Sequence, residues 1–241
     1  MEWKKKEYEN GKLIFEEEYL NGERNGKGKE YDGYGELIFE GEYLNGDKNG
    51  HGKEYYDNGK VKFEGEYLNG KRNGNGKEYY DNGHLEFEGE YLNGERNGKG
   101  KEYRGDLIFE GEYLNGKRNG NGKEYYSNGK LKYEGEYLNG ERNGKGKEYY
   151  NDGKLKFEGE YLNGKRNGKV KEYYSNCKLK FEGEYLNGER WNGKGFNIND
   201  KLEFEIINGN GKGKEYNYYG ELIFEGEYLN GERKRREGKI N

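Results

Sequence analysis

The stretch that decides the fold of this 241-residue chain reads Tyr133-Glu134-Gly135-Glu136-Tyr137-Leu138-Asn139-Gly140-Glu141-Arg142-Asn143-Gly144-Lys145-Gly146. From Leu131 to Tyr137, hydrophobic residues and glycine alternate strictly with charged residues, which is the period of a β-strand with one buried side. The Asn-Gly pairs that follow suit positive φ angles and predict a turn. A second short strand is expected from Lys145 to Tyr150, ended by Asn151-Asp152-Gly153. One β-hairpin therefore fills this stretch.

The same pattern recurs along the whole chain. Glu-Tyr-Leu-Asn-Gly occurs nine times, with its tyrosine at positions 19, 43, 67, 91, 113, 137, 161, 185 and 228. Most steps are 24 residues; a step of 22 reflects a shortened turn at 103–106, and a step of 43 hides a degraded tenth repeat at 204–209. We predict a single array over 1–241, with degenerate repeats near 170–209 and a basic tail at 233–241.

The predicted fold class is all-β, an elongated single-layer antiparallel sheet of about ten tandem hairpins of 22–24 residues. Two strands per repeat at ~4.8 Å spacing give a ribbon on the order of 90–100 Å long. Long helices are excluded because the chain has 45 Gly and neither Ala nor Gln.

The core of such a sheet must be aromatic, since the chain has 27 Tyr and 10 Phe but few aliphatic residues. Glycines within strands, such as Gly135, are expected to leave space for rings from the adjacent strand. Two functions of the aromatic stripe are open. It could form a stacking platform for bases or sugars, but we favour packing of the rings on one another because no other residues can supply a core.

A charge pattern accompanies the turns. Where an acid follows the turn glycine, as at Glu141, Lys or His stands four residues later; where Lys follows, as at Lys71, Asn stands there, with Lys165 and Lys169 as the exception. We predict that the two side chains approach each other across the turn. His51 would then be an ion-pair partner and not a catalyst.

Catalytic and metal chemistry find little support in the sequence. Ser127 and Ser175 fall in expected turns, far in sequence from His51 and His84, and a nucleophile needs a base within reach. The single cysteine, Cys177, allows neither an intrachain disulfide nor, with two distant histidines, a structural zinc site. Carboxylate pairs occur in every repeat and are interpreted as a solvated face. We expect a non-enzymatic protein with no cofactor and no metal.

The repeated residues resemble a known family. The stretch from Tyr133 to Gly146 is similar to the MORN repeat, and the stretch from Tyr125 to Lys132 is similar to a second MORN-type repeat of bacterial proteins labelled antitoxin-like. The resemblance implies a twisted, rod-like antiparallel sheet of hairpins. It also implies scaffolding, dimerisation or membrane association, often beside an enzyme domain such as a lipid kinase or a methyltransferase. The sequence departs from the pattern at four positions, namely Glu17, Val170, Cys177 and Trp191.

Two hypotheses for function follow. The first is a non-catalytic repeat scaffold that binds protein partners, for which a homodimer is one assembly that the resemblance allows. The alternative is a membrane-surface module that binds acidic phospholipid through basic residues; an antitoxin-like binding protein is a third. The residues proposed for lipid or partner binding are Arg233, Lys234, Arg235, Arg236 and Lys239.

The basic cluster also has a structural interpretation, in which charges on an open edge strand discourage end-to-end pairing of sheets. Binding of nucleic acid is disfavoured by the acidic balance of the chain, with a pI near 5.6. No apolar stretch approaches the length of a membrane span. We expect a cytoplasmic protein, attached peripherally to a membrane under the second hypothesis.

Overall fold

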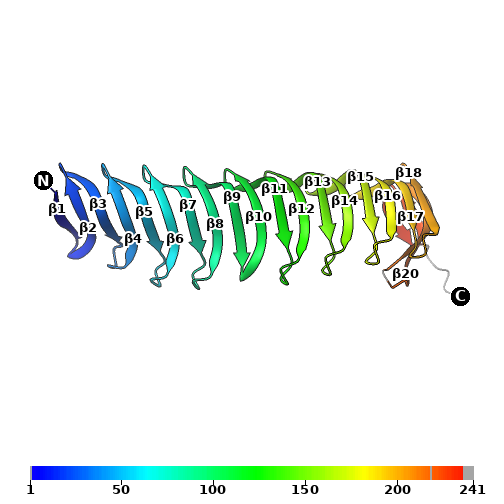
Figure 1. Ribbon diagram of the computed structural model, residues 1–241, viewed down its shortest axis with the longest axis horizontal. Helices are drawn as coiled ribbons and strands as arrows, with labels where there is room; N and C mark the ends of the chain where they lie inside the picture. Colours follow the sequence, from blue (N-terminus) through cyan, green and yellow to red (C-terminus); the bar gives the residue numbers. More distant parts are fainter. Residues whose placement is uncertain (1, 218, 236–241) are drawn as a thin grey trace. The chain divides into compact units, whose positions relative to one another are not determined.

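The computed structural model describes residues 2–217 and 219–235, and within them every regular element is a β-strand. The contacts divide the chain into two units, Met1–Lys117 and Arg118–Asn241. In each unit the paired strands are antiparallel and adjacent in the sequence (Figure 1). The predicted all-β fold of tandem antiparallel hairpins is confirmed.

The strands of the first unit have eight to ten residues each. They are β1 (Glu2–Glu9), β2 (Lys12–Leu20), β3 (Glu23–Tyr31), β4 (Leu37–Leu44), β5 (Asp47–Tyr55), β6 (Val61–Leu68), β7 (Lys71–Tyr79), β8 (Leu85–Leu92), β9 (Glu95–Arg104) and β10 (Asp106–Leu114).

The second unit repeats the pattern, with shorter strands toward its end. They are β11 (Lys117–Tyr125, which starts at the boundary), β12 (Leu131–Leu138), β13 (Glu141–Tyr149), β14 (Leu155–Leu162), β15 (Lys165–Tyr173), β16 (Leu179–Leu186), β17 (Glu189–Phe196), β18 (Leu202–Ile207), β19 (Asn210–Tyr216), β20 (Leu222–Leu229) and β21 (Glu232–Arg235).

The Asn-Gly turns close each hairpin in two residues. Between β6 and β7, Leu68 lies opposite Lys71, and the two residues between them, Asn69 and Gly70, have φ angles of 49° and 79°. Positive φ at both central positions is the signature of the type I′ turn that suits hairpin twist. The backbone N–H of Gly70 also donates to the carbonyl oxygen of Lys48 in the previous hairpin at 2.9 Å. Each such turn is therefore bonded to a strand of the previous hairpin as well as closed.

A bulge follows most of the turns and alters the predicted charge pairing. Gly74 has a φ of 73°, and the backbone N–H of Asn75 donates to Oε1 of Glu66 at 3.2 Å. The predicted contact across the turn is wrong, because Lys145 lies opposite Glu160 of the following strand and not beside Glu141. Lys145 thus lies opposite the glutamate that precedes Tyr-Leu-Asn-Gly in the following strand, and not beside the glutamate that follows its own turn.

Longer loops join one hairpin to the next. In the loop from Tyr80 to His84, the N–H of Tyr80 donates to the carbonyl of His84 at 2.9 Å and the N–H of Gly83 donates to the carbonyl of Tyr80 at 2.8 Å. Gly83 has a φ of 88°, and Cys177 occupies the equivalent place with a φ of 66°. Cys177, one of the four departures from the repeat pattern, therefore occupies a turn-glycine position at a backbone angle that disfavours side chains.

In each unit the core is a row of aromatic rings on one side of the sheet, called here the inner face. In the first unit, Phe63 is fully buried and meets Tyr67 and Tyr91 edge to face at ring-centroid distances of 5.7 and 5.2 Å. A Cβ on Gly76 would lie 2.5 Å from Cζ of Phe63. The strands are drawn as arcs in Figure 1, consistent with a sheet that curves around its rings. The predicted packing of rings over strand glycines is confirmed.

Val170 shows what happens when one of these glycines is lost. Its side chain is buried opposite Gly159, and its φ angle is not positive. The nearby rings of Phe157 and Tyr185 lie 6.4 Å apart, whereas the equivalent pair Phe63–Tyr91 is at 5.2 Å. The valine methyl groups thus occupy space that the rings use elsewhere.

Candidate functional site: a buried charge network and an exposed face

A triad of Glu, Tyr and Arg, in which the Tyr is buried and the two charged side chains are half-buried, recurs on the inner face. In the second unit, Tyr137 donates its hydroxyl hydrogen to Oε1 of Glu124 at 2.6 Å. Arg142 donates from Nε and Nη2 to the two oxygens of the same carboxylate at 3.0 and 2.8 Å. The carboxylate comes from one hairpin, and the other two side chains come from the next. This triad therefore ties two hairpins together through bidentate, charge-assisted bonds.

The arginines of these triads also cover the aromatic core. The guanidinium carbon of Arg142 lies 3.9 Å from the ring centroid of Tyr133, and that of Arg72 lies 4.0 Å from the centroid of Phe63. A guanidinium over a ring face is attracted by the ring quadrupole. The inner face is thus built in two layers, with rings against the backbone and charges above the rings.

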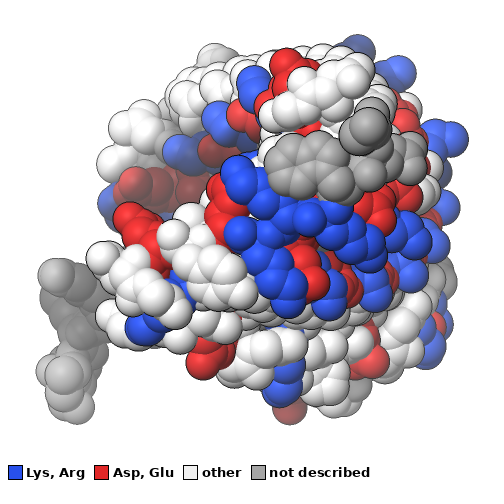
Figure 2. Space-filling model, turned by 90° about the vertical axis from the view of Figure 1, so that its left-hand side faces the viewer, with Lys and Arg blue, Asp and Glu red and all other residues white. Residues whose placement is uncertain are grey.

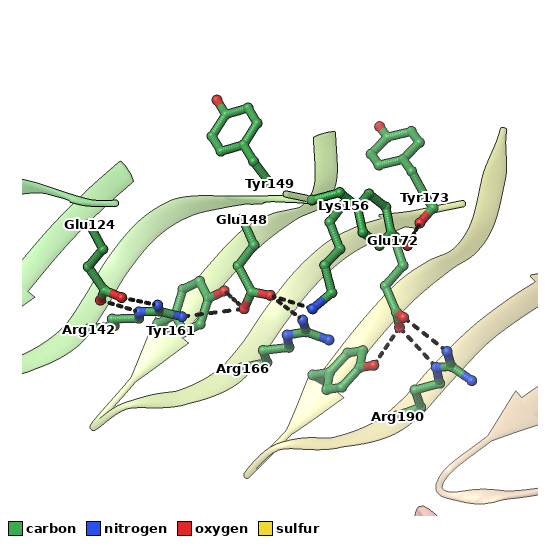
Figure 3. A network of polar contacts seen from close by, with 12 residues as sticks. Glu124, Arg142, Glu148, Tyr149, Lys156, Tyr161, Arg166, Glu172, Tyr173 and Arg190 are labelled. Carbon is green, nitrogen blue, oxygen red and sulfur yellow. Dashed lines mark hydrogen bonds and ion pairs between the residues drawn. The ribbon is translucent and has the colours of Figure 1, made fainter. Parts of the chain in front are cut away.

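Neighbouring triads touch, so that positive and negative groups alternate along the inner face. Figure 3 shows Arg142 between Glu124 and Glu148, at 3.5 Å from Oε1 of Glu148. Lys156 lies 3.6 Å from Oε2 of Glu148. Lys156 has the place of Lys132, which lies 3.8 Å from Glu124. A bulge turns these lysines toward the inner face, so the predicted alternation from Leu131 to Tyr137 does not hold at Lys132.

The triad is lost as a whole in the degraded repeat. The positions of its Glu, Tyr and Arg are held by three residues without ionisable side chains, Gly195, Ile206 and Gly211. Ile206 is buried, at 1% exposure. A buried charge without its partner would destabilise the fold. Because all three members of the triad change together, this repeat leaves no triad charge unpaired.

Arg190 spans this gap in the network. It donates from Nε and Nη2 to the two oxygens of Glu172, both at 3.0 Å, and its Nη1 lies 3.1 Å from Oε2 of Glu215. Burial alone would raise the pKa of Glu172, but the charge and hydrogen bonds of Arg190 outweigh it and lower this pKa to about 2.

The predicted basic cluster at the end of the chain is partly neutralised by this network. Arg233 donates from Nε and Nη2 to Glu215 at 2.7 and 2.6 Å, and Lys234 donates to Glu232 at 2.8 Å. Arg235 is the last residue of β21. Arg236 and Lys239 lie outside the described residues. Sequence analysis had treated Arg233 as a binding residue because Glu215, its partner, lies 18 residues away.

Glu17 is an exception at the first repeat, where it stands in place of the strand glycine. Its side chain is buried, and Oε2 lies 2.8 Å from Nε of Arg24, but neither carboxylate oxygen makes a hydrogen bond within the described residues. Burial raises the pKa of Glu17 to about 7, more than the charge of Arg24 lowers it.

The opposite, outer face carries exposed charges in pairs. Lys53 lies 3.5 Å from Glu64, and Tyr149 donates to Glu134 at 2.6 Å. Figure 3 shows Tyr149 pointing away from the triads. Seen from the β1 side, basic side chains gather in one patch that has a few acidic side chains among them (Figure 2). Lys6 of β1 lies 3.4 Å from Glu16. The outer face is therefore charged without being strongly one-sided.

A row of exposed leucines ends the strands that precede the Asn-Gly turns. Leu68 exposes 50% of its surface. Leu20 is less exposed, at 37%. The remaining leucines at this position are exposed to a degree similar to Leu68: Leu44, Leu92 and Leu114 in the first unit, and Leu138, Leu162, Leu186 and Leu229 in the second. Within a unit, leucines of successive hairpins are two strands apart, which is about 9–10 Å.

The described residues offer few groups for catalysis. Ser127 and Ser175 lie in loops, Cys177 is exposed, and no cluster of three His, Cys, Asp or Glu suited to a metal occurs in that part of the chain. The triad carboxylates already bind Arg and Tyr side chains, which indicates a structural role for them. Sequence analysis missed the triads because it treated all carboxylates alike; the signal was a Glu that recurs before Tyr in the second strand of most hairpins.

Among the residues placed by the structure, no helix is long and apolar enough to cross a membrane.

Comparison with known families identifies the repeats. The MORN repeat matches residues 18–33, 63–85, 87–106, 109–130 and 133–154. A MORN repeat variant matches residues 4–21, 48–69 and 166–187. The chain belongs to the MORN-repeat family, whose members commonly serve as repeat scaffolds or membrane-binding modules.

Other comparisons add little. No curated protein sequence matches significantly. Among solved structures, the chain is similar to "Crystal Structure of TcdB2-TccC3-Cdc42" at 13% identity and a TM-score of 0.18, over 92% of this chain and 12% of that one. It is also similar to "Crystal Structure of TcdB2-TccC3 without hypervariable C-terminal region" at 12% identity and a TM-score of 0.17, over 96% of this chain and 18% of that one. The chain thus spans less than a fifth of either structure, and TM-scores this low carry no argument about function.

Proposed function

We propose that this chain is a non-catalytic scaffold that binds protein partners along its repeated outer face. The observation that carries the proposal is the leucine row, which places half-exposed apolar side chains at the same position of successive hairpins. Single exposed leucines are ordinary, but a regular apolar row in a charged surface is typical of an interaction site. The partner would present apolar side chains at a matching repeat of about 10 Å.

The charges favour this function over attachment to lipid. Exposed lysines of the outer face lie near glutamates, as in Lys29–Glu40 at 3.5 Å and Lys101–Glu88 at 3.7 Å. A surface of balanced pairs has little field beyond the ~8 Å Debye length at physiological salt. Arg233 is held by Glu215 and is not freely available to anionic headgroups. These pairings support a protein partner rather than an acidic membrane.

The leucine row can be tested by substitution in the first unit. Full-length chain with Leu44, Leu68, Leu92 and Leu114 changed to Ser is compared with wild type in pull-downs from native lysate. The matched control changes Lys29, Lys53, Lys77 and Lys101 to Ser, which alters the same number of outer-face side chains. We expect specific partners to be lost from the leucine variant and retained by the lysine variant, with β-sheet circular dichroism unchanged in both.

Flotation with liposomes containing acidic lipid tests the alternative. We expect no flotation of the wild-type chain at physiological salt. Flotation that is lost when Arg235 and Arg236 are changed to Gln would support a lipid-binding tail. Truncation after Glu232 is a poor test, because it removes the partner of buried Glu215.

A further inference from the structure

The long loops between hairpins form a bonded series, called here the loop ladder. Asn58 donates from its side chain to the carbonyl of Asp81 in the next loop at 2.9 Å, and Lys60 donates from Nζ to the carbonyl of Asn82 at 3.0 Å. In the second unit, Lys130 makes the same contact to Asp152 at 3.4 Å. A basic residue at the end of one loop thus normally contacts the next.

The loop ladder is interrupted in the first unit. After the loop Tyr80–His84, the next connection is shortened, since β9 ends at Arg104 and β10 begins at Asp106, with only Gly105 between them. His84 stands where Lys60 stands in the preceding loop. A cavity of about 420 Å³ lies at this place, lined by Tyr80, Asn82, His84, Arg104 and Gly105. We call this cavity the notch.

The lining of the notch is suited to an anion. Arg104 supplies a planar guanidinium, His84 an imidazole and Asn82 a carboxamide, and no carboxylate is among the lining residues. Among the described residues, the side chains of Arg104 and His84 have no hydrogen bond or ion pair. The other three arginines of the first unit, Arg24, Arg72 and Arg96, each pair with a glutamate, so Arg104 differs in having its donors free.

The notch is also held in place by its surroundings. Tyr80 donates its hydroxyl hydrogen to the carbonyl of Tyr103 at 3.1 Å, which fixes one wall against the strand that carries Arg104. The N–H of His84 donates to Oδ1 of Asn82 at 2.9 Å. The side-chain oxygen of Asn82 is thereby occupied, and its NH₂ group remains as a donor.

We propose that the notch is a binding site for a small oxyanion, a carboxylate or phosphate group, held by Arg104 in bidentate fashion and by donors of His84 and Asn82. Guanidinium is the side chain best matched to such planar or tetrahedral oxyanions. The volume is within the usual range for small-ligand sites. This site is independent of the leucine row, so that failure of one proposal leaves the other standing.

The imidazole NMR signals provide a direct test, because the chain has only two histidines, His51 and His84. His51 lies opposite Glu66 in β5 and does not line the notch. Full-length chain is titrated at constant ionic strength and pH with sodium phosphate, sodium acetate and a hexaglutamate peptide. The signals are assigned with His51→Gln. We expect saturable shifts of the His84 signals while His51 stays unmoved.

Two variants separate charge from shape. Arg104→Gln removes the guanidinium and is expected to weaken binding of the anion at least ~10-fold, which is the effect of losing one charged hydrogen bond. A loop variant that changes Gly105-Asp106 to Asp-Asn-Gly-Lys keeps Arg104 but restores the length of neighbouring loops, and it should abolish saturable binding. Lys71→Gln, which removes a charge at an exposed position of the first unit, should change nothing.

The outcomes decide the proposal. Saturation by acetate and phosphate alike supports a general oxyanion site, and tighter binding of hexaglutamate identifies peptide carboxylate as the preferred source. Linear shifts without saturation for all three probes, equal shifts at both histidines, or undiminished binding by the loop variant would overturn it.

Discussion

Nη1 of Arg190 lies 3.1 Å from Oε2 of Glu215, across a repeat that has lost its own triad. The same guanidinium holds Glu172 with two hydrogen bonds. One arginine therefore joins the ordinary network on one side of the degraded repeat to the network on the other. Sequence decay in this repeat removed the charged triad residues together while the buried chain of ion pairs stayed connected.

The Glu172–Arg190 pair should make the second unit sensitive to acid. We expect Glu172→Gln to reduce the free energy of unfolding by roughly 3 kcal/mol at pH 7, because it leaves Arg190 buried without one of its two partners. The pKa of Glu172 is lowered from 4.5 to about 2. The stabilisation is thus present above pH 4.5 and lost as the pH falls through about 2.

Urea denaturation of both chains from pH 7 to pH 2 measures this difference. The gap between wild type and variant should narrow steadily below pH 4.5. Glu182→Gln, at an exposed position of the same unit, is the control and should behave as wild type. A difference in unfolding free energy between wild type and Glu172→Gln that does not change with pH would contradict the lowered pKa of Glu172.

Glu17 should act in the opposite direction. Because its pKa in the folded chain is raised from 4.5 to about 7, its neutral form is favoured by folding. The contribution of neutral Glu17 to stability is complete below pH 4.5 and is lost as the pH rises through about 7. We expect amide hydrogen-exchange protection factors in β2 and β3 to fall over this range in wild type and not in Glu17→Gly. Glu16→Gln is the control, and an equal decline in Glu17→Gly would refute the prediction.

The strand glycines under the rings should not tolerate a methyl group. A Cβ at Gly76 would lie 2.5 and 2.6 Å from two ring atoms of Phe63, so Gly76→Ala should cost roughly 1–3 kcal/mol by overpacking. Gly33→Ala is the matched control, since nothing lies within 4 Å of its added Cβ and its φ is not in the left-handed region. Thermal unfolding of the two variants measures the contrast; similar midpoints would argue against ring packing on glycine.

Cys177 is a place where glycine should stabilise the chain. At a φ of 66°, a side chain costs on the order of 1 kcal/mol or more relative to Gly. We expect Cys177→Gly to raise the melting temperature. Ser175→Gly, in the same loop at an angle without positive φ, should lower it slightly because glycine adds freedom to the unfolded chain. A decrease for both variants would show that the angle at Cys177 is not limiting.

The sequence predicted those features that depend on local chemistry. Strand alternation around Tyr133, positive φ at Asn-Gly and the need for glycine under rings all follow from a few neighbouring residues. The triads could not be found in this way, because Glu124 and Arg142 meet only after bulges have set the register. The same bulges turned Lys132 inward and placed Lys145 opposite Glu160. The sequence therefore did not predict side-chain orientation correctly wherever a bulge interrupted the two-residue period of the strand.

The sharing of each triad between two hairpins bears on how such a chain changes length over generations. Glu54 precedes Arg72 by 18 residues, and Glu78 precedes Arg96 by the same interval. If unequal recombination removed the 24 residues 55–78, Glu54 would again stand 18 residues before an arginine. Gain or loss of one full period therefore regenerates a paired interior at once, whereas loss of half a period would leave a carboxylate without its guanidinium. Length is in this sense a heritable variable that selection can adjust in whole steps.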